Sequence, residues 1–160
     1  MKNHELNIDL KIENIKKIDY SEKSHLIFEN GTVVLDDASI GLLTALNFSA
    51  QEKYIDVILK VDFYKNISEK RYDLFSIKTS NIFKILNYNE VIHKDSDEKF
   101  TVPNGLMRLL FDVSISNTRG MLAVLNTKPE YSKLVLPLFG QNKIKSILKA
   151  NLNKTKSQQC

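Results

Sequence analysis

Few side chains of this 160-residue chain could carry chemistry. Its three histidines, His4, His25 and His93, are far apart, and none has a partner at the spacing of a metal site. Asp36 and Asp37 are adjacent, but neighbouring carboxylates on an extended chain point to opposite sides. Phosphate-binding glycine loops, nucleophile elbows and zinc-protease motifs do not occur. We therefore expect no enzyme activity, no catalytic residue, no metal and no other cofactor.

Cysteine content and hydropathy narrow the class of protein further. Cys160 is the only cysteine, which excludes an intrachain disulfide and a thiolate metal cluster within one chain. The apolar runs fall short of the ~20 residues that a membrane-spanning helix needs. The first residues, MKNHELNIDLK, lack the apolar core of a signal peptide. These features predict a cytoplasmic protein without membrane insertion.

Positive charge is concentrated at the end of the chain. The net charge is +4, and no acidic residue follows Glu130, whereas six lysines do. Such a stretch could attract nucleic acid, an anionic membrane or an acidic protein surface. It is also typical of a solvated helix face that runs into a tail. Because residues 141–152, which carry Lys143, Lys145 and Lys149, contain no aromatic residue, nucleic acid is the less favoured partner.

The first half of the chain predicts β-strands. Apolar and polar residues alternate over 6–13 and again over 55–63, which is the period of a half-buried strand. Residues 71–79 form a further predicted strand, and Ser80-Asn81 is expected to interrupt it before 82–85. Asn30-Gly31 lies between two apolar runs and predicts a tight hairpin. The pattern over 42–48 fits either a strand or a helix.

The second half predicts helices. Pro103 suits a first helical turn, and apolar residues at three- and four-residue spacing continue the helix to Arg119, where Gly120 is expected to end it. This helix is apolar on more sides than one small core needs, which predicts an oligomer. Residues 87–99 are mostly polar apart from Val91 and Ile92, and 93–99 are interpreted as a surface loop. Residues 141–152 are interpreted as a short amphipathic helix.

Strands followed by helices indicate the α+β class. We expect an antiparallel sheet of about four strands, with a long and a short helix packed on one face. No repeat or linker divides the chain, so residues 1–152 are interpreted as one domain and 153–160 as a flexible basic tail.

Four segments resemble the SecB family of export chaperones in order and spacing over about residues 39–150. They are YIDVILKVDFY, YDLFSIKTSNIFKI, VPNGLMRLLFDVSISNTRG and YSKLVLPLF. The resemblance implies a four-stranded SecB-like fold assembled as a dimer or a dimer of dimers. It also implies an ATP-independent holdase, which binds unfolded polypeptides through apolar grooves and delivers them to a partner. Apolar burial requires no nucleotide, consistent with the missing phosphate loop.

The resemblance also assigns residues to two kinds of surface. The positions that match the family's client groove are Phe83, Ile85, Leu136, Leu138 and Phe139. The positions that match its subunit interface are Leu74, Phe75, Ile77, Thr79, Leu106, Leu110 and Val113.

Two departures from the family pattern affect the expected partner. Export members dock the basic tail of SecA through acidic residues on the sheet, but Ser76 stands at such a position here and the chain is basic. These departures argue against SecA docking. SecB-like relatives also act as chaperones dedicated to an antitoxin of a toxin–antitoxin system, so that role stays open. A basic nucleic-acid-binding or adaptor module is the alternative from a different class.

Overall fold

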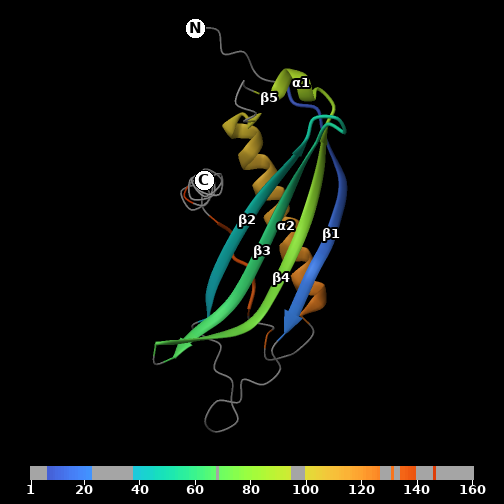
Figure 1. Cartoon of the computed structure of the whole chain (residues 1–160). Helices are drawn as coiled ribbons and strands as arrows, with labels where there is room; N and C mark the ends of the chain where they lie inside the picture. The colour runs from blue at the N-terminus through green and yellow to red at the C-terminus, as the bar shows by residue number, and fades with distance from the viewer. Residues whose placement is uncertain are drawn as a thin grey trace.

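Strands with alternating apolar residues form a four-stranded antiparallel sheet, and a long helix covers one face of it (Figure 1). The computed structural model describes residues 7–22, 38–67, 69–94, 100–126, 131, 134–139 and 146. The elements are β1 Leu10–Glu22, β2 Ser39–Ser49, β3 Tyr54–Ile67, β4 Lys70–Ile85, α1 Tyr88–Val91, β5 His93–Lys94, β6 Phe100–Thr101 and α2 Asn104–Leu125. The strand order is β1-β4-β3-β2, so β1 and β2 are the edges. The predicted α+β class, antiparallel sheet and long helix are confirmed.

The core lies between the central strands and α2. The inward side chains of β3 are 0–1% exposed; they are Ile55, Val57, Leu59, Val61 and Phe63. Phe63 stacks on Phe75 of β4, with ring centroids 4.4 Å apart. The intervening polar residues, such as Asp56 and Lys60, lie on the opposite, open face. A slip of one residue in register would place these charges in the core, so burial of one face fixes the register.

The predicted break at Ser80-Asn81 is wrong, because β4 continues through both residues to Ile85. The polar side chains find hydrogen-bond partners on neighbouring elements and do not end the strand. The Ser80 hydroxyl donates to Asp56 at 2.7 Å, and the Asn81 amide donates to the carbonyl of Val57 at 3.3 Å. Asn81 also accepts a hydrogen bond from Asn117 of α2 at 3.1 Å. Buried polar groups that are satisfied in this way are compatible with a central strand.

Helix α2 begins where expected but extends past Gly120 to Leu125. Pro103 precedes the helix, and its carbonyl accepts the N–H of Met107 at 3.0 Å. A glycine within a helix costs only about 1 kcal/mol relative to alanine. Leu122, which is 3% exposed, packs into the core beyond the glycine. Packing of this last turn therefore outweighs the helix-ending tendency of Gly120.

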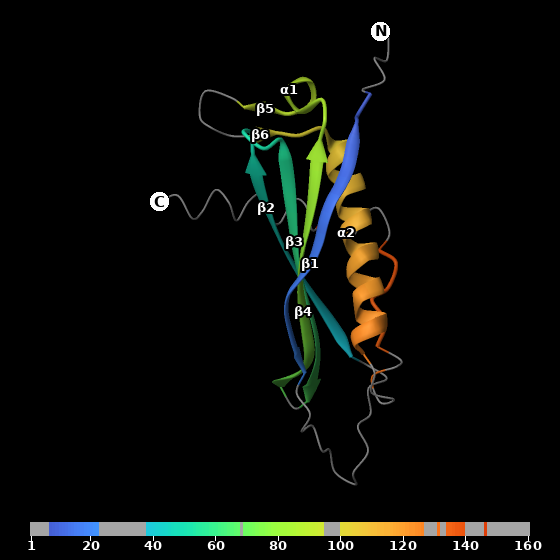
Figure 2. The same cartoon turned by 90° about the vertical axis from the view of Figure 1, so that its right-hand side faces the viewer.

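The residues just before the predicted surface loop contribute to the core, whereas His93 and Lys94, the described part of that loop, are exposed. Tyr88, Val91 and Ile92 are 1–4% exposed in and beside the short helix α1. They close the end of the sheet, where β5 and β6 form a small separate pair (Figure 2). Three predictions lie outside the described residues: the hairpin at Asn30-Gly31, the helix over 141–152 except for Ser146, and the tail over 153–160.

Candidate functional site

Catalytic groups are sparse in the part of the chain that the structure describes. Among these residues no three His, Cys, Asp or Glu side chains gather as they would around a metal ion. Of the histidines, only His93 is described, and it is exposed on β5.

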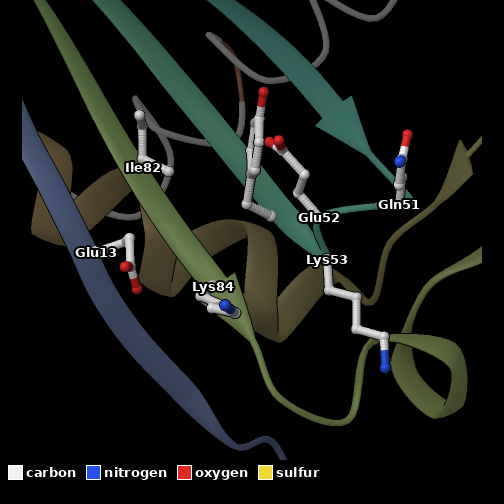
Figure 3. Close-up of a pocket in the computed structure, with 7 residues that line it drawn as sticks. Glu13, Gln51, Glu52, Lys53, Ile82 and Lys84 are labelled. Carbon is white, nitrogen blue, oxygen red and sulfur yellow. The ribbon is translucent and has the colours of Figure 1, made fainter.

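A shallow hollow of about 430 Å³ lies between the β2–β3 turn and the open side of β4 and β1 (Figure 3). Its lining residues are Glu13, Gln51, Glu52, Lys53, Tyr54, Ile82 and Lys84. They include both charges but no serine, cysteine or histidine. The hollow therefore offers no nucleophile–base pair of the kind used in acyl transfer.

The residues predicted to bind clients divide into two groups. Phe83, Ile85 and Leu136 are 0–1% exposed, so they belong to the core of the single chain. Leu138 is 86% exposed, and Phe139 is half-buried against the edge of the core. Only this second pair is accessible to another polypeptide without opening the fold.

The residues predicted to form a subunit interface are also mostly internal. Leu74, Phe75, Ile77, Thr79, Leu106 and Leu110 are each 0–2% exposed within one chain. The Thr79 hydroxyl, for example, forms a 2.8 Å hydrogen bond with the hydroxyl of Thr118 on α2. The structure thus assigns these side chains to helix–sheet packing, which corrects the interface assignment. Val113, which is half-buried on α2, is the only one of the set with surface to offer.

Residues 134–139 form an extended strap beside α2 (Figure 2). Arg119 holds the strap, because its Nε donates to the carbonyl of Leu136 at 2.7 Å and its Nη2 to that of Pro137 at 2.8 Å. Hydrogen bonds from a charged donor are stronger than those from a neutral one. With the strap held by these two hydrogen bonds, Leu136 is buried and Leu138 lies at the surface. Arg119, predicted only as the last residue of the helix, therefore positions the apolar strap.

The β1 edge of the sheet carries features that discourage pairing with another strand. It is interrupted by register shifts between Ile12 and Asn14 and between Lys17 and Asp19. It also carries six charged side chains: Lys11, Glu13, Lys16, Lys17, Asp19 and Glu22. Bulges and charges are the usual protection of an exposed edge. β1 is thus poorly suited to accept an additional strand.

The β2 edge is different in every one of these respects. Strand β2, SIGLLTALNFS, contains no charged residue and no proline. It pairs with β3 over eleven residues, from Ser39–Tyr64 to Ser49–Tyr54, without a register shift. No other strand of the described part lies on its outer side. A long, regular, uncharged edge is a template for a further strand.

Apolar side chains flank this edge on both faces of the sheet. Ile40, Leu42, Leu46 and Phe48 are half-buried on the α2 side and pack against the core. Phe48 also stacks on Phe100, with ring centroids 4.8 Å apart. On the open face Leu43 is 49% exposed. An added strand would therefore cover apolar surface as well as form main-chain hydrogen bonds.

Sequence reasoning missed β2, because the pattern over 42–48 was ambiguous in period. A separate signal was present. Residues 38–51, between Asp37 and Glu52, form the longest uncharged stretch of the chain. At the edge of a sheet, the absence of charge indicates a surface not protected from pairing.

Comparison with known proteins leaves the family undetermined. No family model and no curated protein matches the sequence. A crystal structure of a protein of unknown function from Streptococcus agalactiae matches with a TM-score of 0.26 and 16% identity, covering 78% of this chain and 95% of that one. Among the described residues no helix is long and apolar enough to span a membrane.

Proposed function

We propose that the protein is an ATP-independent chaperone that binds unfolded polypeptides along the β2 edge. The observation that carries the proposal is the uncharged, regular edge strand Ser39–Ser49. The contrast with the protected β1 edge supports it. The resemblance to SecB-like proteins points to the same activity and remains a prediction, as does the cytoplasmic location.

Main-chain pairing suits a binder of many sequences. An extended client contributes backbone N–H and C=O groups whatever its side chains are, and pockets for alternate side chains provide selectivity. The half-buried row Ile40, Leu42, Leu46 and Phe48 would receive the apolar side chains of that client. The exposed Leu138 on the strap offers further apolar contact elsewhere on the surface. Neither kind of contact requires a nucleotide.

Assembly into a dimer or a dimer of dimers is part of the proposal. The outward side of α2 carries apolar Leu109 and Val124, which are 45% and 76% exposed. Several copies of a shallow site would raise affinity for long clients through multivalency. An antitoxin is one possible client of such a site, and only identification of co-purifying proteins would distinguish it from export substrates.

Aggregation of a denatured client tests the proposal. The wild-type protein should slow the rise in light scattering of a reduced, unfolded polypeptide at stoichiometric ratio without ATP. Leu43→Lys should weaken this effect, since a charge on the β2 edge opposes pairing. Ile18→Lys is the matched control, because Ile18 is also 49% exposed but lies at a register shift in β1.

The comparison of the two variants decides the assignment. Both place one lysine on an edge strand, so general effects of charge on solubility are equal. A wild type that fails to protect any client would refute the holdase. Equal protection by wild type and Leu43→Lys, with loss in Ile18→Lys, would instead assign binding to the β1 edge.

A further inference from the structure

Lysine side chains gather on the open face of the sheet, which Figure 1 presents toward the viewer with α2 behind it. The register places Lys60 of β3 directly opposite Lys78 of β4, and Lys84 of β4 directly opposite Lys11 of β1. Like charges at directly opposed positions repel and destabilise a sheet. Two such pairs on one face indicate that these lysines have a role other than stabilising the sheet.

Part of this positive charge is not neutralised. Lys60 pairs with Asp62 at 3.1 Å, and Lys11 pairs with Glu13 at 3.5 Å. In the described part of the chain, three lysines of this face form no ion pair; they are Lys16, Lys78 and Lys84. Asp19 lies directly opposite Lys78 on β1 but forms no ion pair with it.

Apolar surface lies among these lysines. Ile82 lies between Lys84 and Lys78 along β4, and Ile58 of β3 lies directly opposite Ser80 of the same strand. Both isoleucines are half-buried. At about 3.4 Å per residue, Lys78 and Lys84 are separated by about 20 Å. The face therefore presents an extended track in which two half-buried isoleucines lie between cationic positions.

We propose that this open face docks an acidic, partly apolar segment of a partner protein. Its carboxylates would meet Lys16, Lys78 and Lys84, and its apolar side chains would cover Ile58 and Ile82. Charge complementarity of this kind steers and orients association. The docking face is separate from the β2 edge, so it does not depend on the proposed holdase function.

Carboxylates on the same face favour a peptide over nucleic acid. Asp56 accepts the Ser80 hydroxyl at 2.7 Å, and Asp62 lies 4.0 Å from Arg71 as well as near Lys60. These acids are interspersed with the lysines and would repel a continuous phosphate backbone. A peptide with spaced acidic residues can avoid them.

Fluorescence anisotropy with a designed probe tests the proposal. The probe is a labelled peptide of about twelve residues, enough to span the track, with glutamate at every third position and leucine and serine between. At low ionic strength, Lys78→Gln and Lys84→Gln should each weaken binding about two- to fivefold, the range of an exposed ion pair. Arg108→Gln is the matched control, because it removes the same charge from the exposed side of α2.

A loss of folding can be told apart from a loss of peptide binding. The urea midpoint of Lys78→Gln should not fall, because the change removes repulsion from Lys60. A peptide with glutamine in place of glutamate should bind more weakly. No binding of the glutamate peptide, equal binding of the glutamine peptide, or an equal loss in Arg108→Gln would overturn the proposal. Displacement of the peptide by a single-stranded oligonucleotide that binds more tightly would also overturn it, in favour of nucleic acid.

Discussion

The contrast between Phe83 and Leu138 distinguishes a core residue from a candidate binding residue most clearly. It is 0% exposed on the inner face of β4, whereas Leu138 of the strap is 86% exposed. Truncation of a fully buried phenylalanine costs about 3–5 kcal/mol, because contacts are lost and a cavity remains. That is a large part of the ~5–15 kcal/mol that stabilises a typical domain. Leu138→Ala should change the free energy of unfolding by only about 0.5 kcal/mol or less.

Urea denaturation followed by far-ultraviolet circular dichroism measures both values. Phe83→Ala should shift the midpoint strongly to lower urea, and Leu138→Ala should leave it near wild type. A client-binding measurement on the two folded proteins should then show a loss for Leu138→Ala. A free-energy change below about 1 kcal/mol for Phe83→Ala, together with lost client binding, would refute the burial argument and restore Phe83 to the client groove.

Three further predictions concern α2, α1 and the strap. Gly120→Ala should raise the free energy of unfolding by about 0.5–1 kcal/mol in urea denaturation, because the position is helical and has room for a Cβ. The Tyr88 hydroxyl is buried without a hydrogen-bond partner among the described residues, and burial raises the pKa of Tyr88. Because the tyrosine ionises at lower pH in the unfolded chain, the free energy of unfolding of the wild type should decrease as the pH rises above about 10. Tyr88→Phe should be about 1 kcal/mol more stable than wild type near neutral pH, and its stability should lack the decrease that Tyr88 causes at high pH. Arg119→Met should release the strap, so limited proteolysis within 134–139 should become faster than in wild type. An unchanged rate would contradict the role of Arg119 in holding the strap.

The sequence predicted those elements whose pattern is local. Strand β3 was evident because its apolar residues alternate over nine positions, and Pro103 marked the start of α2. The continuity of β4 was not evident, because the partners of Ser80 and Asn81 lie 24–36 residues away. The end of α2 was missed for a similar reason. Leu122 stabilises the last turn through the core and not through the helix itself.

The candidate site was harder to predict than the fold. An apolar residue that alternates with polar ones looks the same whether it faces a client or the protein's own core. Phe83 and Ile77 are therefore indistinguishable from binding residues until burial is known. The β2 edge required the strand order, because only the topology places the uncharged stretch at the margin of the sheet. The role of Arg119 depended on the position of the strap, which the sequence does not indicate.

Hydrogen exchange of the protein with and without an unfolded client tests the central claim most directly. If the client pairs with β2, exchange of backbone amides in Ser39–Ser49 should become slower on binding, while exchange in Leu10–Glu22 of β1 should not change. Protection confined to β1, or a bound client that protects neither edge, would contradict binding along the β2 edge.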